Sequence, residues 1–287
     1  MKNKMAAILM TAVMVIGLGA CGGNTNAQIS TKQGNSAKDL KATVSVNGST
    51  TVQPLAEEIA QLLNKTYPNL EIEIQGTGSG TGIKSVSQGS CDIGMSSREL
   101  KDTETGIDTH VVAYDGIAAI VNPNNPVKNL TSQQLKDIFE GTIKNWKEVG
   151  GNDADIIVIS REAGSGTRSA FEELLKLTKK DGDKEVSSLK EDALIAEGNG
   201  AIKASIASKE NAVSYMSLGY LDDSVKAISI DDVECTVENI KAGTYKISRP
   251  LLLLTSGQIS EGAQAFLDCF LSEEGQKIVS EKYITVK

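Results

Sequence analysis

Strand-like and helix-like stretches alternate along most of this chain, and this alternation constrains its fold more than any other feature. Residues 70–74 alternate apolar and charged side chains, which is typical of a half-buried strand. Residues 55–63 carry apolar side chains at helical spacing, and Pro54 stands at the start, where proline is tolerated. Such alternation favours an α/β fold with largely parallel sheets.

The pattern predicts the order of the elements. The expected strands cover residues 43–46, 70–74, 92–95, 111–121, 156–159, 212–215, 227–230 and 247–254. The expected helices cover residues 55–63, 82–88, 132–139, 167–177, 200–208 and 262–271. Ligands of open α/β sheets bind beside the carboxyl ends of strands, so the segments that join strands to helices are the candidate binding segments.

Three such segments are rich in glycine, serine and threonine: residues 47–51 (NGSTT), 76–82 (GTGSGTG) and 161–167 (REAGSGT). They offer hydroxyl donors, and glycines that let backbone N–H groups approach a ligand closely. Each precedes a helix, whose first N–H groups are unpaired and carry partial positive charge. One segment alone is usually a cap or a turn. Three together predict a site for a small tetrahedral oxyanion, phosphate above all.

The third segment also contributes Arg161, whose planar guanidinium suits bidentate contact with an oxyanion. Hydrogen bonds to a charged group contribute roughly 1.5–3 kcal/mol each. Many such donors can therefore offset the dehydration of a multiply charged anion. The segments match no nucleotide-binding or hydrolase motif, because Ile83 separates Gly82 from Lys84 and neither Ser79 nor Ser165 stands in a GxSxG sequence.

Asp115 is a further candidate, with two interpretations open. A carboxylate beside an anion repels it unless the anion carries a proton that the carboxylate can accept. Hydrogenphosphate has such a proton and sulfate does not, so Asp115 would discriminate between them. Alternatively, Asp115 is a turn residue before Gly116.

The N-terminal residues form a targeting segment. Lys2 and Lys4 precede an apolar run over residues 5–18, which is short for a helix that spans a bilayer. Residues 18–21 (LGAC) resemble a bacterial lipobox, which implies cleavage before Cys21 and a diacylglyceryl thioether on its sulfur. A plain signal peptide is the alternative. We therefore expect a lipoprotein signal peptide over residues 1–20 and a flexible tether over residues 21–41.

Charge and composition exclude several functions. The formal net charge is −8 and the cations are scattered, which argues against nucleic acid as a partner. His110 is the only histidine, and Cys91, Cys235 and Cys269 form no metal-ligand motif, so we expect no metal, no catalytic triad and no cofactor. These three cysteines stand among apolar or small residues and are expected to be buried free thiols.

Several segments, taken in order, resemble one family. They are residues 48–54 (GSTTVQP), 76–82, 92–97 (DIGMSS), 115–117 (DGI) and 161–167. The chain resembles the phosphate-binding lipoproteins of bacterial ABC importers, the PstS-type substrate-binding proteins, over nearly all of residues 44–283. The resemblance implies a type II periplasmic-binding-protein-like clamshell, with residues 42–117 and 247–287 in lobe one, residues 118–246 in lobe two and two crossover strands.

The resemblance also implies a function and a site. The protein would be lipid-anchored through Cys21 on the extracytoplasmic face of the cell membrane. It would capture inorganic phosphate and pass it to the permease and ATPase subunits of an ABC importer, without enzymatic activity. The predicted phosphate-binding residues are Ser49, Thr50, Thr51, Ser79, Ser97, Asp115, Arg161, Ser165, Gly166 and Thr167.

The sequence departs from the family at one position. Some members place a proton-accepting aspartate where this chain has Ser97, so Asp115 would take over that role while Ser97 donates. The alternatives are a receptor for another oxyanion such as sulfate or molybdate, an exported phosphate-ester hydrolase, and a surface protein used in adhesion or sensing.

Overall fold

The computed structural model describes residues 39–182 and 184–286. Its strands are β1 (Ala42–Gly48), β2 (Leu70–Gly76), β3 (Ile93–Ser96), β4 (Asp108–Val121), β5 (Asn129–Leu130), β6 (Ile157–Arg161), β7 (Thr178–Asp181), β8 (Lys184–Ser187), β9 (Leu194–Ala196), β10 (Ala212–Ser217), β11 (Lys226–Ile230) and β12 (Ser248–Thr255). The signal segment, Cys21 and nearly all of the predicted tether lie outside the described residues.

The helices are α1 (Gln53–Asn64), α2 (Ser79–Ser87), α3 (Ser132–Glu140), α4 (Gly166–Leu174), α5 (Gly198–Ser208), α6 (Val237–Lys241), α7 (Glu261–Leu271) and α8 (Glu273–Ser280), with 3-10 turns η1 (Trp146–Val149) and η2 (Leu218–Tyr220). Six of the described helices correspond to the expected ones, and α6 and α8 were not predicted from the sequence. None of the described helices is long and apolar enough to cross a membrane.

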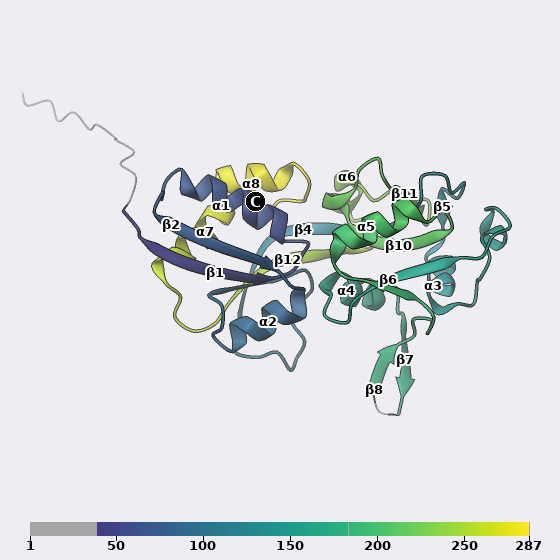
Figure 1. The fold of residues 1–287 in the computed structure, drawn as a ribbon, viewed down its shortest axis with the longest axis horizontal. Helices are drawn as coiled ribbons and strands as arrows, with labels where there is room; N and C mark the ends of the chain where they lie inside the picture. The colour runs from purple at the N-terminus through teal and green to yellow at the C-terminus, as the bar shows by residue number, and fades with distance from the viewer. Residues whose placement is uncertain (1–38, 183, 287) are drawn as a thin grey trace, which may run out of the picture. The chain divides into compact units, whose positions relative to one another are not determined.

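The main sheet is mixed rather than largely parallel, which corrects the expectation. Its order is β2-β1-β3-β12-β4-β10-β6-β9, and β11 pairs with β4 and β5. The pairs β1–β2, β1–β3, β10–β6 and β6–β9 are parallel. The central strands break this pattern, because β12 is antiparallel to both β3 and β4, and β4 is antiparallel to β10. Figure 1 shows β4 and β12 between the two groups of parallel strands.

Two large apolar cores and a smaller cluster of α2 and β12 residues lie along this sheet. One large core contains residues of β1, β3, α1 and α7, and the other contains residues of β6, β10, α3 and α5. Strand β4 enters both, since Val112 and Ala113 belong to the first core and Ile117 belongs to the second. Likewise, Ile247 packs in the second core and Leu251 in the first. The chain therefore passes between the cores twice, along β4 and at the start of β12, and these are the two crossover strands.

Helices cover both faces of the strands of the first core, with α1 and α7 packed in that core and α2 in the smaller cluster on the other face. Figure 1 shows α1, α7 and α8 on one side of β1 and β2, and α2 on the other. Helix α8 was not predicted from the sequence. It follows α7 directly because Ser272 ends one helix and caps the next, its hydroxyl accepting a hydrogen bond from Gly275 N.

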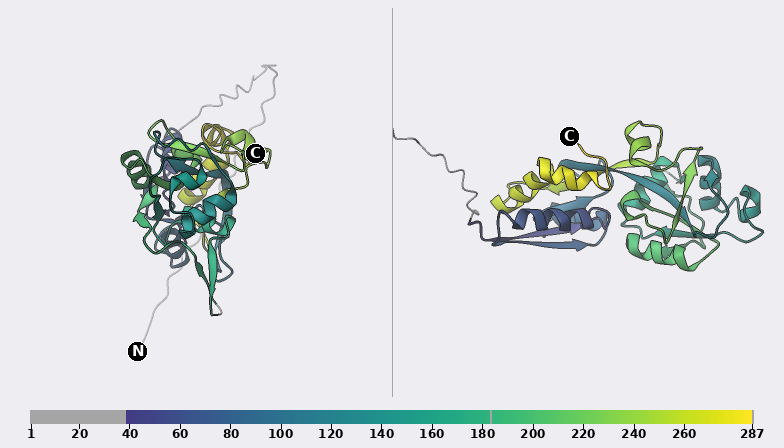
Figure 2. Two further views of the ribbon diagram at one scale, coloured as in Figure 1. Left: turned by 90° about the vertical axis from the view of Figure 1, so that its right-hand side faces the viewer. Right: turned by 90° about the horizontal axis from the view of Figure 1, so that it is seen from above.

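The expected helix over residues 167–177 ends early, and this is a second correction. Helix α4 stops at Leu174, and Lys176 adopts a positive φ of 53° that a helix cannot continue. The chain then forms the antiparallel hairpin β7–β8, which the sequence analysis missed. The hairpin projects away from the main sheet in Figures 1 and 2.

Candidate functional site

The first predicted segment joins β1 to α1 and is tightly packed. Ser49 and Thr51 are buried, and Thr50 is partly exposed. The Ser49 hydroxyl accepts a hydrogen bond from Thr51 N at 3.2 Å and donates to Ser97 Oγ at 2.9 Å. The Ser49 hydroxyl thus stabilises the turn of this segment and links it to Ser97, which follows β3.

The second segment forms the first turn of α2, which begins earlier than predicted. Gly78 has a φ of +94°, a conformation that other residues rarely adopt, and α2 starts at Ser79. The buried Ser79 hydroxyl accepts a hydrogen bond from Ser97 N at 3.0 Å, and its oxygen lies 3.3 Å from Ser97 Oγ. Ser49, Ser79 and Ser97 therefore form one buried cluster of hydroxyl groups.

The third segment joins β6 to α4. Ser165 caps α4 by accepting a hydrogen bond from Arg168 N, and Gly166 and Thr167 are the first two helical residues. The buried Tyr215 hydroxyl lies 2.8 Å from Ser160 Oγ and accepts a hydrogen bond from Arg161 N at 3.4 Å. This network fixes the position of Arg161, which is the last residue of β6.

Arg161 is the most informative residue of the site. Its guanidinium is 1% exposed and donates through Nε and Nη2 to Glu162, at 2.8 Å each, and through Nη2 to Thr50 Oγ1 at 3.4 Å. The third nitrogen, Nη1, is buried and has no hydrogen-bond partner among the described residues. Buried guanidinium nitrogens are normally paired, so Nη1 marks a place where an acceptor fits.

Glu162 stays charged beside this guanidinium. Burial alone would raise the pKa of its carboxyl group, but the hydrogen bonds and charge of Arg161 outweigh burial and hold the pKa below its usual range. The carboxylate thereby occupies two of the three nitrogens and leaves Nη1 as the donor.

The three segments meet. Thr51 Oγ1 lies 3.3 Å from Thr167 Oγ1, which joins the first segment to the third. Gly80 N donates to Gly164 O at 3.0 Å, which joins the second to the third. A methyl group on Gly166 would lie 2.2 Å from Ser79 Oγ, so only glycine fits there. The site is thus a buried, donor-rich cluster formed by segments that join elements of both cores.

Asp115 is fully buried at the edge of this cluster. Its Oδ2 accepts hydrogen bonds from Arg249 Nη2 at 3.0 Å and Nε at 3.2 Å, and its Oδ1 accepts one from Ser217 Oγ at 2.9 Å. Burial raises the pKa of Asp115, while the Arg249 guanidinium opposes that rise. The predicted role of Asp115 as acceptor of a ligand proton stays a prediction.

Several residues of the cluster were not predicted from the sequence. They are Asn199, Ser217, Tyr220, Arg249 and Tyr283. The Tyr220 hydroxyl donates to Thr50 O at 2.6 Å, and the Tyr283 hydroxyl donates to Thr51 O at 3.3 Å. Of these residues, the sequence could have indicated Arg249, because it is a cation at the start of an apolar run and that run forms a buried strand.

The remaining predicted groups lie elsewhere. In the described part of the chain, no three His, Cys, Asp or Glu side chains gather as a metal site. Cys91 and Cys235 are buried free thiols, as expected, whereas Cys269 is only partly buried. His110 stands near the start of β4 with its Nε2 2.9 Å from Thr255 Oγ1.

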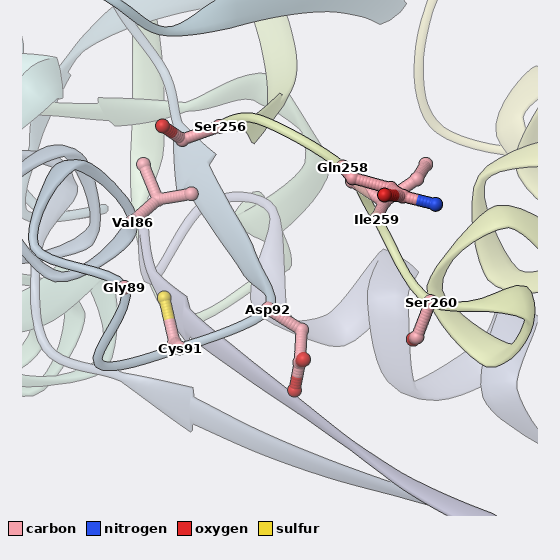
Figure 3. Close-up of a pocket in the computed structure, with 8 residues that line it drawn as sticks. All are labelled: Val86, Gly89, Cys91, Asp92, Ser256, Gln258, Ile259 and Ser260. Atoms are coloured by element: carbon pink, nitrogen blue, oxygen red, sulfur yellow. The ribbon is translucent and has the colours of Figure 1, made fainter.

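The hollow in Figure 3 is not part of this cluster. Its lining includes Cys91, Asp92, Ser256 and Ser260 and none of the predicted phosphate-binding residues. The Asp92 carboxylate is already engaged, because it accepts hydrogen bonds from the backbone N and the hydroxyl of Ser45. The buried cluster, in which Arg161 Nη1 has no hydrogen-bond partner among the described residues, therefore remains the candidate ligand site.

Comparison with known proteins defines the class of protein and then the family. The PBP superfamily domain model matches residues 27–274, which agrees with the two-core α/β fold. The chain is 34% identical to the phosphate-binding protein PstS of Bacillus subtilis, over 99% of this chain and 95% of that protein. The chain therefore belongs to the PstS family of phosphate-binding proteins, and the resemblance seen in the sequence is confirmed.

Similar solved structures also belong to phosphate-binding proteins of ABC transporters. A putative phosphate ABC transporter substrate-binding protein with bound phosphate from Clostridium perfringens is 45% identical with a TM-score of 0.81, covering 86% of this chain and 100% of that one. An ABC-type phosphate transport receptor from Vibrio cholerae is 40% identical with a TM-score of 0.71, covering 85% of this chain and 100% of that one.

Proposed function

We propose that this protein is the substrate-binding component of a phosphate ABC importer and captures inorganic phosphate in the buried hydroxyl cluster. The observation that carries the proposal is the buried Nη1 of Arg161, which lacks an acceptor among the described residues. The bound phosphate of the Clostridium perfringens relative and the family of the chain support the same ligand. The protein is a receptor rather than an enzyme, since its relatives are binding proteins of a transporter.

The proposed contacts follow from the donors around Arg161. Nη1 would approach one phosphate oxygen, and hydroxyl and backbone N–H groups at the starts of α1, α2 and α4 would approach the others. The proposed donors are Thr50, Thr51, Ser79, Ser97, Ser165, Gly166 and Thr167. The predicted residue Ser49 already donates its hydroxyl to Ser97 Oγ and its backbone N–H to Met95 O, so it would act by orienting Ser97. Micromolar binding corresponds to about −8 kcal/mol, which a few charge-assisted hydrogen bonds supply.

We further propose that the two cores belong to two lobes that close on phosphate, with residues 42–117 and 247–287 in one and residues 118–246 in the other. The transition of β4 from one core to the other supports this division. The Gly80–Gly164 hydrogen bond joins the proposed lobes at the site. Scattering should therefore show a smaller radius of gyration with phosphate than without it, and unchanged dimensions would count against closure.

The lipid anchor is a separate proposal. Cys21 lies outside the described residues, and the LGAC sequence supports attachment there. The anchor would hold the protein on the extracytoplasmic face of the cell membrane, beside the permease and ATPase subunits that receive the ligand.

Calorimetry with phosphate, arsenate and sulfate tests the ligand. The parent should bind phosphate and arsenate and bind sulfate much more weakly, and Arg161→Gln should weaken phosphate binding by about 10- to 100-fold through loss of a charged hydrogen bond. Lys147→Gln removes an exposed surface cation and is the matched control. Tighter binding of sulfate or molybdate than of phosphate would indicate another oxyanion receptor, and turnover of a phosphate ester would indicate a hydrolase.

A further inference from the structure

The Thr51 hydroxyl has an unusual set of neighbours. Its oxygen lies 3.2 Å from Arg249 Nη2 and 3.0 Å from Asn199 Nδ2, and both nitrogens can only donate. A hydroxyl oxygen accepts two hydrogen bonds and donates one. Because both acceptor positions of Thr51 are occupied, its proton points to the remaining neighbour, Thr167 Oγ1 at 3.3 Å, or to a ligand oxygen beside it.

Both donors to Thr51 are themselves held in place. Arg249 donates to Asp115 Oδ2 through Nε and Nη2, and its Nη1 donates to Ser97 O at 3.1 Å. The Asn199 side-chain oxygen accepts a hydrogen bond from Ser217 N, which fixes the amide with its nitrogen toward Thr51. Arg249 and Asp115 are both 3% exposed or less, so water does not compete for these contacts.

Asp115 has few positions left for a ligand. Its Oδ2 accepts two hydrogen bonds from Arg249 and its Oδ1 accepts one from Ser217. Its geometry is that of a counter-ion to Arg249, which in turn orients the threonine hydroxyl.

We infer that Arg249 is a positioning residue for anion binding: with Asp115 as its counter-ion, it fixes the Thr51 hydroxyl as a hydrogen-bond donor toward the ligand. The inference rests on the proposed function. It assigns to Arg249 an effect on phosphate affinity that is exerted by orienting the Thr51 hydroxyl. Removing Arg249 should therefore weaken phosphate binding only while a hydroxyl is present at position 51.

A double-mutant cycle measured by calorimetry with inorganic phosphate tests this inference. The first change is Asp115→Asn with Arg249→Gln, which removes both charges and leaves no buried ion unpaired. The second is Thr51→Val, which removes the hydroxyl at similar volume. Thr51→Ser, which keeps the hydroxyl, is the matched control. Circular dichroism and thermal unfolding without phosphate establish that each variant is folded.

Thr51→Val should weaken phosphate binding by about 10- to 100-fold. The neutral pair should weaken binding by about tenfold in the parent and in Thr51→Ser, but by less than about threefold in Thr51→Val. If the neutral pair does not fold, Arg249→Lys replaces it with the same expected dependence on Thr51. Multiplicative losses, or an unchanged affinity of the neutral pair, would overturn the inference alone. A parent that binds no phosphate would overturn the proposed function and, with it, this inference.

Discussion

Asp115 and Arg249 are direct cross-strand neighbours on β4 and β12, and their side chains form a buried ion pair with a 3.0 Å separation. Removing one member of such a pair leaves a buried charge without a partner, which typically costs about 3–5 kcal/mol. We therefore expect Arg249→Gln to lower the free energy of unfolding by several kcal/mol. The double variant Asp115→Asn with Arg249→Gln should lose clearly less.

Urea unfolding of Arg249→Gln, Asp115→Asn and the double variant, without phosphate, measures this difference in the free energy of unfolding. A double variant that is no more stable than Arg249→Gln would contradict the interpretation of the pair as mutually compensating charges. Lys147→Gln, at an exposed ion pair, should change stability by no more than about 1 kcal/mol.

Gly166 permits the close approach of α4 to α2. A methyl group there would lie 2.2 Å from Ser79 Oγ and 2.8 Å from Ser97 Oγ. Gly166→Ala should therefore weaken phosphate binding by at least about tenfold, because the three segments could no longer close around the ligand. Gly164→Ala is the control, since a methyl group at that position meets no atom within 4 Å and its backbone carbonyl is retained. Equal affinities of the two variants in calorimetry would refute the packing argument.

The Arg98–Glu104 pair should make stability depend on pH. Hydrogen bonds from Arg98 hold the pKa of Glu104 below its usual range, and the two side chains are 10% and 21% exposed. A carboxyl group with a lowered folded-state pKa stabilises the fold above its unfolded pKa, about 4.3, and loses this contribution as the pH falls through the folded value. Glu104→Gln should thus cost about 1 kcal/mol at pH 7.

The same variant should differ less from the parent at pH 3, because this pH is below the unfolded-state pKa of Glu104 and the stabilisation by the carboxylate decreases as the pH falls toward its lowered folded-state pKa. Urea unfolding at the two pH values provides the measurement. A difference that is constant between pH 7 and pH 3 would show that the ion pair is not its cause.

Cys21 should determine membrane attachment. Cys21→Ser removes the sulfur that would carry the lipid, so the variant should enter the aqueous phase on detergent partition while the parent enters the detergent phase. Mass spectrometry of the parent should show the added lipid on Cys21. Detergent-phase partition of the variant would point instead to another means of attachment.

Local sequence was sufficient to identify three segments that the fold brings together. Glycines, hydroxyl residues and Arg161 lie within short stretches at strand-to-helix junctions, and the structure brings all three stretches together. Family membership confirmed the fold class and the type of protein that these stretches indicated.

The residues that hold the three segments from other parts of the chain, such as Arg249 and Asn199, could not be predicted in this way. Arg249 is 134 positions from Asp115, and Asn199 is 148 positions from Thr51. Only the register of β4 with β12 and the placement of α5 bring them together. The β7–β8 hairpin was missed for a different reason, because its polar sequence lacks the apolar alternation by which a strand is recognised.

Tyr220 and Tyr283 hold the first predicted segment, residues 47–51, by its main chain, through the carbonyl groups of Thr50 and Thr51. Every amino acid has such a carbonyl group, so these two hydrogen bonds do not depend on which side chains stand at positions 50 and 51. Substitutions at these two positions would therefore alter the side chains of the proposed site while both tyrosine hydrogen bonds are retained, which makes positions 50 and 51 suitable for engineering a receptor with a different ligand preference.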